Sequence, residues 1–473
     1  MIALSVAEIA AITDGTITGE PASAAGPAGS VIVSGPVVID SRQAAPGALF
    51  AALPGERVDG HDYAAAAVAA GAAAVLASRP LPGLPRAPVI VVADVTAALS
   101  SLARAVLDRL PSATVVGITG SSGKTSTKDL TAAVVERLGA TVAPVGSFNN
   151  ELGLPLTVLR ADAATRYLVL EMSARGVGHI AHLCAIAPPR IGAVLNVGRA
   201  HAGKFGSIDA VAKAKGELVE ALPADGMAVL NADDPNVAAM AQRTAARVVT
   251  FGLGADADVR ATDISLDELG RGSFRMTMQA GSAQVRLRLH GGHHVANALA
   301  AAAIAAELGM DVPAIADALS TATARSKKRM ELHERPDGVL VVNDAYNANP
   351  DSTRAAIEAL AHLMSGGRRG FAVLGHMAEL GDIADESHQE AGLLAARARV
   401  TGLVAVGEQA ASVLTGARAQ PGWAGEAIAV PNALAAVDAL RNRLRPGDVV
   451  LVKASNSAGL WEVADGLLAE VDQ

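Results

Sequence analysis

The fold of this chain is organised around one stretch, Thr114-Val-Val-Gly-Ile-Thr-Gly-Ser-Ser-Gly-Lys-Thr-Ser126. Residues 114–119 are a short run rich in β-branched residues, which predicts a buried strand. From Lys124 onward, apolar residues recur at helical spacing as far as Leu138, and Gly139 predicts the C-terminal end of that helix. A strand, a glycine loop and a helix in this order are the context that a phosphate-binding loop requires.

The loop itself predicts a nucleotide site. Its glycines let backbone N–H groups converge on phosphate oxygens, and the helix N-terminus adds positive potential. Lys124 would reach the outer phosphates, and the Thr125 hydroxyl would ligate Mg²⁺. The strict pattern G-x-x-x-x-G-K-[ST] has glycine where this chain has Ile118. A glycine turn with a surface lysine is the alternative, and the flanking strand and helix favour the nucleotide site over it.

Composition bounds the class of protein. The 473 residues predict about three domains, and 51% hydrophobic residues with only 2% aromatic ones predict large aliphatic cores. A net charge of −8 argues against a nucleic acid or an anionic membrane as partner. The single cysteine, Cys184, allows no intrachain disulfide and fits a reducing compartment. We see no typical signal peptide at the N-terminus and no apolar run of about 20 residues that would span a bilayer.

Alternating strand-like and helix-like runs predict an α/β fold of three α/β domains, residues 1–110, 111–318 and 319–473. The central domain would be a mostly parallel phosphate-loop sheet with a small antiparallel hairpin, and the C-terminal domain would be Rossmann-like. The predicted strands are residues 36–40, 48–53, 73–77, 89–92, 114–119, 167–171, 191–197, 273–279, 285–290, 339–344, 371–375, 403–407 and 449–453. The predicted helices outside the phosphate loop include residues 63–70, 96–110 and 294–306.

Polar side chains follow the predicted strands of the central domain. Glu171 ends one strand, His201 follows the end of another, and Thr125 follows a third. Because ligands gather at the carboxyl ends of parallel strands, we expect these side chains at one edge of one sheet. Carboxylate and hydroxyl oxygens suit Mg²⁺, and imidazole is a tolerable addition. A plain loop histidine is the alternative for His201.

The third domain has its own polar strand ends. The loop Asp344-Ala-Tyr-Asn-Ala-Asn-Pro350 carries more side-chain donors than a turn needs, and Lys453 ends a later strand. The basic cluster Arg325-Ser-Lys-Lys-Arg329 lies near the joint between the second and third domains. It is either a solvated patch or a lid that meets the triphosphate on domain closure.

Together these motifs resemble the Mur ligases, the ATP-dependent amide-forming enzymes of peptidoglycan precursor assembly. The resemblance covers essentially the whole chain, and Ile118 in the phosphate loop is usual in that family. It rests on the motifs Asp40-Ser-Arg42, Pro54-Gly-Glu-Arg-Val-Asp-Gly-His61, Thr119-Gly-Ser-Ser-Gly-Lys-Thr125, Ser147-Phe-Asn-Asn-Glu-Leu-Gly-Leu-Pro155, Glu171-Met-Ser173, Asn196-Val-Gly-Arg-Ala-His201, Ala214-Lys-Gly-Glu217, Asn343-Asp-Ala-Tyr-Asn-Ala-Asn-Pro-Asp-Ser352 and Leu451-Val-Lys-Ala-Ser455.

The resemblance is strongest to the branch that adds D-alanyl-D-alanine to UDP-N-acetylmuramoyl-tripeptide through an acyl phosphate, and the Tyr-Asn-Ala-Asn-Pro signature is its specific mark. The Asp-Asn-Pro-Arg signature of the amino-acid-adding branch is absent. The resemblance implies a cytoplasmic enzyme, expected as a monomer, with ATP as third substrate. The alternatives are an amino-acid-adding or folylpolyglutamate-synthase-type amide ligase, and a nucleotide-binding regulatory protein without ligase activity. A guanine-reading Asn-Lys-x-Asp motif is absent after the phosphate loop, which argues against a GTPase switch.

The resemblance also assigns roles at the nucleotide. ATP would contact Gly120, Ser121, Ser122, Gly123, Lys124, Thr125, Ser126, Asn297, Arg329 and Asp344. Two Mg²⁺ ions are implied, with metal contacts from Thr125, Glu171, His201 and Lys215. Lys215 would react with CO₂ to a carbamate, and the catalytic set would be Lys124, Glu171, His201 and Lys215. A surface lysine is the alternative for Lys215, and Lys213 is the competing candidate.

The two remaining substrates follow from the same resemblance. The UDP-sugar would lie near Asp40, Ser41, Arg42, Asn149 and Asn150. The dipeptide pocket would include Asn347, Asn349, Pro350 and Lys453. The chain departs from the family pattern at Lys204 and His376, where acidic residues are common, and at the pair His293-His294. These departures bear on local contacts rather than on the reaction.

Overall fold

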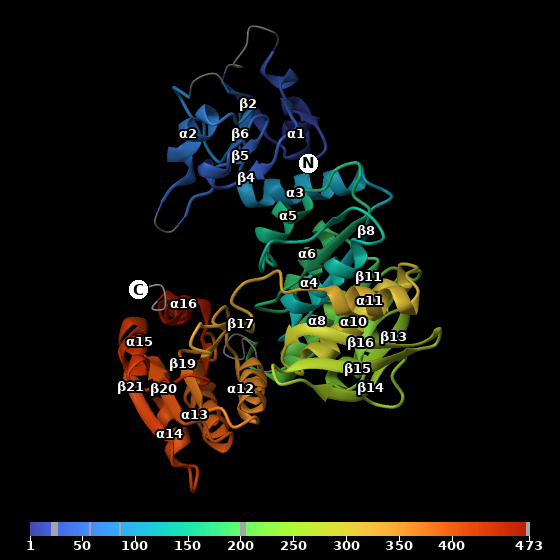
Figure 1. Cartoon of the computed structure of the whole chain (residues 1–473). Helices are drawn as coiled ribbons and strands as arrows, with labels where there is room; N and C mark the ends of the chain where they lie inside the picture. The colour runs from blue at the N-terminus through green and yellow to red at the C-terminus, as the bar shows by residue number, and fades with distance from the viewer. Residues whose placement is uncertain (20–26, 56–57, 85–86, 199–204, 470–473) are drawn as a thin grey trace. The chain divides into compact units, whose positions relative to one another are not determined.

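A computed structural model describes the helices and strands of this chain (Figure 1). The described residues are 1–19, 27–55, 58–84, 87–198 and 205–469. They form two compact units. The first comprises Met1–Gly117, Leu138–Ser173 and Ile180–Ile191, and the second comprises Ile118–Arg137, Ala174–His179 and Gly192–Gln473.

The N-terminal segment forms a five-stranded sheet in the order β2-β7-β6-β5-β4. Its strands β4 to β7 pair in parallel, and β2 is antiparallel at the edge. Strands β5 and β6 are buried along their whole length, as a parallel sheet covered on both faces requires. The strand bounds are β2 Thr16–Thr18, β4 Val37–Val38, β5 Leu49–Ala51, β6 Ala74–Ala77 and β7 Val89–Val91.

The four predicted strands and two predicted helices of this segment are confirmed, the helices as α2 (Ala64–Ala69) and α3 (Val95–Asp108). The structure adds elements at the start of the chain that the prediction missed: α1 (Val6–Ile12), β2, and the short antiparallel pair β1 (Leu4–Ser5) and β3 (Ile32–Val33). A Ser5–Glu8 capping box starts α1. That sequence signal was present, because Ser followed three residues later by Glu is a helix-start pattern.

The central sheet has nine strands in the order β16-β15-β14-β13-β12-β11-β8-β10-β9. The predicted hairpin is confirmed as β15 and β16, and it gains a third antiparallel strand, β14, that pairs in parallel with β13. The prediction missed β14 because much of this strand is polar and exposed. The bounds are β8 Thr114–Thr119, β9 Thr141–Val142, β10 Tyr167–Glu171, β11 Ile191–Val194, β12 Met227–Asn231, β13 Arg247–Gly252, β14 Val259–Leu266, β15 Arg271–Met278 and β16 Gly281–His290.

The helix after the phosphate loop is shorter than predicted. It ends at Val135, and the residues up to Gly139 form turns, so the predicted end at Gly139 is wrong. A side chain at Gly139 would crowd Arg166, so this glycine allows a close approach of neighbouring chain rather than ending the helix. The helices of this segment are α4 Lys124–Val135, α5 Gly153–Val158, α6 His179–Ile186, α8 Ile208–Glu220, α9 Pro235–Ala238, α10 His294–Glu307 and α11 Val312–Thr321.

The C-terminal segment forms a six-stranded sheet in the order β17-β18-β22-β19-β20-β21. All its pairs are parallel except β17 with β18. Aliphatic clusters cover both faces of the sheet, with α12 and α13 on one face and α15 and α16 on the other (Figure 1). The bounds are β17 Glu331–Glu334, β18 Leu340–Asn343, β19 Gly370–Leu374, β20 Gly402–Val406, β21 Glu426–Val430, β22 Val449–Lys453, α12 Pro350–Met364, α13 Ala384–Arg397, α14 Ser412–Arg418, α15 Ala433–Arg441 and α16 Trp461–Ala469.

The α/β class is therefore confirmed, and each of the three large sheets lies inside one of the three predicted domains. The exact domain boundaries at 110 and 318 stay a prediction. Within the described ranges, we find no helix that is both long and apolar enough to cross a membrane.

Candidate nucleotide and ligation site

The phosphate loop has the predicted strand–loop–helix context. Strand β8 ends at Thr119, and α4 begins at Lys124 with Gly123 as its N-cap in the left-handed region, at φ 78°. A Cβ atom on Gly123 would lie 2.7 Å from Oδ1 of Asn297. Glycine is thus required here both for backbone conformation and for the close approach of Asn297, a predicted ATP residue, to the loop.

Two side-chain contacts brace the loop from the segment after β11. The Asn196 carboxamide accepts from the Ser122 N–H at 2.8 Å and donates to the Ser122 carbonyl at 3.2 Å. The Ser121 hydroxyl accepts from the Gly198 N–H at 2.8 Å and donates to its carbonyl at 3.2 Å. Our sequence reading gave Asn196 no role, although it stood in a quoted motif. Its bracing holds the loop in a shape that a short polar run alone would not keep.

The predicted phosphate-binding side chains lie at the start of α4. Lys124 bends back over the loop, and its Nζ donates to the Gly120 carbonyl at 2.7 Å. Thr125 is buried in the first turn of α4, and Ser126 is partly exposed. The loop therefore presents a lysine and a hydroxyl at a helix N-terminus, the combination that binds the phosphates and Mg²⁺ of a nucleotide.

Histidine 294 supports Asn297 from the same helix turn. Its Nδ1 accepts from the Asn297 Nδ2 at 3.4 Å. Burial lowers the pKa of His294 well below its ordinary value, and the neighbouring His293 and His290 add to that effect. The departure from the family pattern at this position therefore places a neutral imidazole beside a predicted ATP residue.

Lysine 215 is the predicted lysine that the structure buries. It lies in α8 with 4% of its surface exposed, whereas Lys213 on the same helix is exposed. Desolvation by burial lowers the pKa of Lys215 well below its ordinary value of 10.5, and the charge of Lys124 lowers it further. Lys215 is thus within electrostatic reach of the phosphate-loop lysine, and burial favours its uncharged amine. Between the two candidates, the geometry favours Lys215.

Glutamate 171 ends strand β10, as predicted, and is almost fully buried. Its Oε1 accepts from the Asn149 Nδ2 at 2.7 Å. Asn150 accepts from the Gly153 N–H at 2.9 Å and so holds the start of α5. We predicted Asn149 and Asn150 as UDP-sugar contacts; the structure adds that Asn149 orients a predicted metal-binding carboxylate.

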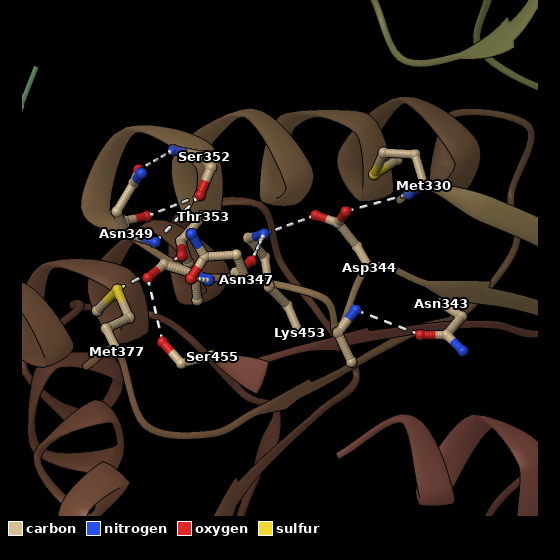
Figure 2. Close-up of polar contacts among 12 residues, drawn as sticks. Met330, Asn343, Asp344, Asn347, Asn349, Ser352, Thr353, Met377, Lys453 and Ser455 are labelled. Carbon is tan, nitrogen blue, oxygen red and sulfur yellow. Dashed lines mark hydrogen bonds and ion pairs between the residues drawn. The ribbon is translucent and has the colours of Figure 1, made fainter. Parts of the chain in front are cut away.

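The carboxyl edge of the C-terminal sheet carries a second polar group (Figure 2). The Lys453 Nζ donates to Asp344 Oδ2 at 2.6 Å and to the Asn347 carbonyl at 2.9 Å. The side chain of Lys453 is only 2% exposed, and that of Asp344 is 15% exposed. Ser455 donates to the Ala348 carbonyl at 3.3 Å. Strands β18 and β22 are neighbours, so the chain brings the ends of two distant motifs together as parallel topology predicts.

The polar loop continues into the start of α12. Asn349 is the N-cap of that helix in a capping box with Ser352, and Pro350 occupies the first turn. The Asn349 Nδ2 also donates to the Ser121 carbonyl of the phosphate loop at 3.3 Å (Figure 2 shows the cap). Both Asn349 and Pro350 are buried. They therefore build the link between the signature loop and the phosphate loop, and a direct contact with a dipeptide stays a prediction; Asn347 is exposed.

The basic cluster 325–329 is not a simple solvated patch. Arg325 makes two hydrogen bonds of 2.6 Å to the Glu136 carboxylate just after α4. The Lys328 Nζ lies 3.6 Å from the Trp461 ring centroid, and the Arg329 guanidinium lies 4.2 Å from that of Tyr346. Arg329, a predicted ATP residue, is thus stacked on the signature loop. Movement of this cluster as a lid stays a prediction.

The remaining predicted residues lie apart from these groups or outside the described residues. Asp40 and Arg42 form a 2.7 Å ion pair after β4, with Arg42 87% exposed, and Ser41 begins the short turn between them. His201 and Lys204 fall outside the described residues. His376 stacks on His388 with 5.6 Å between ring centroids, and burial lowers its pKa.

Comparison with known proteins places this architecture in a family. The chain matches the profile of the Mur ligase middle domain at residues 118–305. It matches the Mur ligase glutamate ligase domain at residues 328–456 and the Mur ligase family catalytic domain at residues 36–106. It is 51% identical to the UDP-N-acetylmuramoyl-tripeptide–D-alanyl-D-alanine ligase of Mycobacterium tuberculosis, over 99% of this chain and 98% of the relative. The chain belongs to the Mur ligase family.

Solved structures of Mur ligases have the same fold. A crystal structure of MurF from Acinetobacter baumannii matches this Mur ligase with a TM-score of 0.85 at 30% identity and covers 99% of both chains. MurF from Thermotoga maritima, in complex with ADP, matches with a TM-score of 0.79 at 30% identity and covers 93% of this chain and 98% of that one. The resemblance that the motifs indicated is therefore confirmed over the whole length.

Proposed function

We propose that this Mur ligase joins D-alanyl-D-alanine to UDP-N-acetylmuramoyl-tripeptide and converts ATP to ADP and phosphate. The observation that carries the proposal is the hydrogen bond from Asn349, in the Tyr-Asn-Ala-Asn-Pro signature, to Ser121 in the phosphate loop. It ties the loop that binds phosphate to the polar edge that holds Lys453 and Asp344. The relatives that cover the full chain carry the name of this ligase, and the product belongs to peptidoglycan synthesis.

The reaction needs activation because a peptide carboxylate is a poor electrophile. Its oxygen attacks the γ-phosphorus of ATP, the bond from that phosphorus to the ADP oxygen breaks, and an acyl phosphate forms. The dipeptide amine then attacks the acyl carbon, loses a proton, and phosphate leaves. Lys124 at the N-terminus of α4 neutralises charge on the transferring group, where positioning and electrostatics supply most of the catalysis. Exclusion of water protects the acyl phosphate from hydrolysis.

The donor groups of this chain suit magnesium. The Thr125 hydroxyl and the Glu171 carboxylate are oxygen ligands of the kind that Mg²⁺ takes, and both side chains are buried. The described residues contain no group of three or more His, Cys, Asp or Glu that would hold a metal by themselves. That finding agrees with Mg²⁺, which usually takes only one or two protein ligands besides waters and substrate phosphates. When bound, the ion withdraws charge from the phosphoryl oxygens; we propose two such ions, with His201 as a further ligand.

We also propose a carbamate on Lys215. The uncharged amine nitrogen forms a bond to the carbon of CO₂ and loses a proton, which gives an anionic, carboxylate-like group. Burial already favours the uncharged amine that this step requires, and the nearby positive charge of Lys124 would stabilise the anion formed. The carbamate would add an oxygen ligand for magnesium on a helix whose other lysine, Lys213, faces solvent.

The substrate assignments follow the polar edges of the sheets. The UDP-sugar would contact Asp40, Ser41 and Arg42, which follow strand β4, together with Asn149 and Asn150. The dipeptide would lie near Asn347 and Lys453. The three-domain division at residues 110 and 318, a monomeric state and a place in the cytoplasm belong to the same proposal; the single cysteine fits a reducing compartment.

An acceptor assay tests the function. Purified protein should form ADP and phosphate only when both UDP-N-acetylmuramoyl-tripeptide and D-alanyl-D-alanine are present, and mass spectrometry should detect the joined product. Turnover with single amino acids or with folate substrates would favour the amino-acid-adding or folylpolyglutamate alternatives. ATP binding without product under any acceptor would favour a regulatory protein, and rapid ATP hydrolysis without either substrate would contradict the proposal.

A substitution tests the phosphate loop. Lys124→Ala should lower turnover by at least about 100-fold, because the residue neutralises the transferring phosphoryl group. Its melting temperature should stay near that of the parent, because the side chain is only partly buried. Turnover near that of the parent would contradict the role that we give Lys124.

A further inference from the structure

Arginine 243 grips the helix that carries Lys215. This residue ends the short helical turn Ala239–Arg243, and its guanidinium lies against α8. Its Nη1 donates to the Ala212 carbonyl at 3.0 Å, and its Nη2 donates to the Lys213 carbonyl at 2.8 Å. Its Nε donates to the Glu220 carboxylate at 3.0 Å. One planar cation therefore binds two backbone carbonyls and one side chain of the same helix.

Gly216 makes room for this contact. A Cβ atom built on Gly216 would overlap the Arg243 guanidinium. Glycine in a helix interior costs about 1 kcal/mol relative to alanine, so its place beside Lys215 has to be offset by some gain. The gain that the structure offers is the seat of the Arg243 guanidinium against the helix backbone.

The contact fixes one particular turn of α8. Carbonyls 212 and 213 accept the helical N–H groups of residues 216 and 217, and Arg243 occupies their remaining acceptor capacity. Farther round the same turn, the Glu217 carboxylate accepts from the Gly178 N–H. Lys215 lies between these two anchors in sequence, so both the height and the rotation of its turn are held.

Holding this turn matters because Lys215 is buried at a cost. Desolvation disfavours its charged form, and rotation of the helix toward solvent would relieve that cost. The Arg243 side chain is 26% exposed, yet it makes three hydrogen bonds in a fork that a flexible lysine could not reproduce. Its bonds oppose the rotation that desolvation of Lys215 favours.

We infer that Arg243 is a positioning residue for Lys215, which it holds through α8 in the buried place where its amine can react with CO₂. The inference rests on the proposed carbamate for its purpose, and on the Arg243, Gly216 and Glu217 contacts for its geometry.

The first test measures the position of Lys215 without reference to activity. The parent, Arg243→Ala and Gly216→Ala proteins are treated with acetic anhydride, and mass spectrometry follows acetylation of Lys215 relative to the exposed Lys213. Both substitutions should raise the relative labelling of Lys215 about tenfold, because loss of bonds to a charged donor frees the turn. Unchanged labelling in Arg243→Ala would overturn the inference, even if the carbamate proposal holds.

The second test measures the carbamate. With ¹³C-labelled bicarbonate, the parent should show a carbamate ¹³C signal that is lost in Lys215→Met. Arg243→Ala should need about tenfold more bicarbonate for half of that signal and for half-maximal turnover, with the KM for the dipeptide unchanged. No signal in the parent would contradict the carbamate proposal alone, since the labelling test still judges the clamp.

A double substitution separates this contact from general damage to the helix. Gly216→Ala should add no further labelling in the Arg243→Ala background, because the group that its Cβ displaces is gone. Glu220→Gln is the matched control: it removes the charge partner of Arg243 but leaves both carbonyl contacts, and labelling should stay near that of the parent. Additive effects, or equal effects of Glu220→Gln and Arg243→Ala, would overturn the inference. Arg243→Lys serves if Arg243→Ala does not fold.

Discussion

Two buried lysines in this protein show how neighbouring charge decides what burial does. Lys215 and Lys453 are 4% and 2% exposed. Lys453 points at the Asp344 carboxylate, 2.6 Å away, and at a backbone carbonyl. For Lys215, the ionic charge that acts on it is that of another cation, Lys124. The first lysine ties two loops together; the second loses its preference for the charged form.

The difference teaches that burial alone does not make a lysine reactive. A carboxylate at hydrogen-bond distance compensates the desolvated ammonium, and the pair then works as a structural link. A second cation adds to the desolvation cost and shifts the balance to the free amine, which is the nucleophilic form. Four predictions break or sharpen this comparison, beginning with the largest effect.

Removal of the reactive lysine should abolish ligation without unfolding. Lys215→Met should lower turnover by at least about 100-fold, because it removes the group that would become a magnesium ligand. The melting temperature should stay the same or rise, because methionine fills the buried space without a desolvated amine. Lys213→Met is the control and should keep parental turnover, since Lys213 is exposed. Full activity of Lys215→Met would end the carbamate proposal.

Removal of the paired lysine should instead unfold its surroundings. Lys453→Met leaves the Asp344 carboxylate largely buried without its cation, which should lower the free energy of unfolding by about 3–5 kcal/mol. Urea unfolding followed by circular dichroism measures the loss. The double variant Lys453→Met/Asp344→Asn should recover most of it, because no unpaired charge remains. A single variant as stable as the parent would show that the ion pair is not the link we describe.

The pH dependence of stability should distinguish the two sites. Because the pKa of Lys215 in the folded protein lies below the 10.5 of an ordinary lysine, the unfolded chain binds more protons between those two values. Stability should therefore rise with pH in that window, by up to about 1.4 kcal/mol per pH unit. In CO₂-free buffer, the difference in unfolding free energy between the parent and Lys215→Met should follow this slope. A difference that stays flat with pH would contradict the lowered pKa.

An exposed cation provides the lower limit of the comparison. Arg325 forms a two-bond pair with Glu136, but both side chains are about 40% exposed. Arg325→Ala should change the free energy of unfolding by about 1 kcal/mol or less, and the change should shrink at high salt. A loss as large as that in Lys453→Met would mean that the linker depends on this pair far more than its exposure indicates.

The long, regular signals in the sequence predicted the architecture well. The β-branched run 114–119 and the alanine-rich helix from His294 are confirmed, because each commits to one backbone period over many residues. Strands β17 and β21 were missed, since both are edge strands with charged or half-exposed residues. The predicted helix end at Gly139 failed because that glycine serves a close approach to Arg166.

For the site, local motifs identified residue types but not their partners. The sequence named Lys215 and Lys213 as rivals, and only the packing of α8 buries one and exposes the other. It named Asn149 and Asn349, but not the bonds from Asn149 to Glu171 and from Asn349 to Ser121. These bonds join segments that are far apart in the chain, so no local pattern contains them.

The sequence by itself determined the α/β class, the phosphate loop and the polar signatures at strand ends, because backbone period, glycine placement and local chemistry are properties of neighbouring residues. The tertiary structure alone decided which lysine lies beside Asp344 and which lies near Lys124, and where Arg243 grips α8. The physical reason is that desolvation and electrostatic interaction depend on distance in space, which is set only when remote segments pack together.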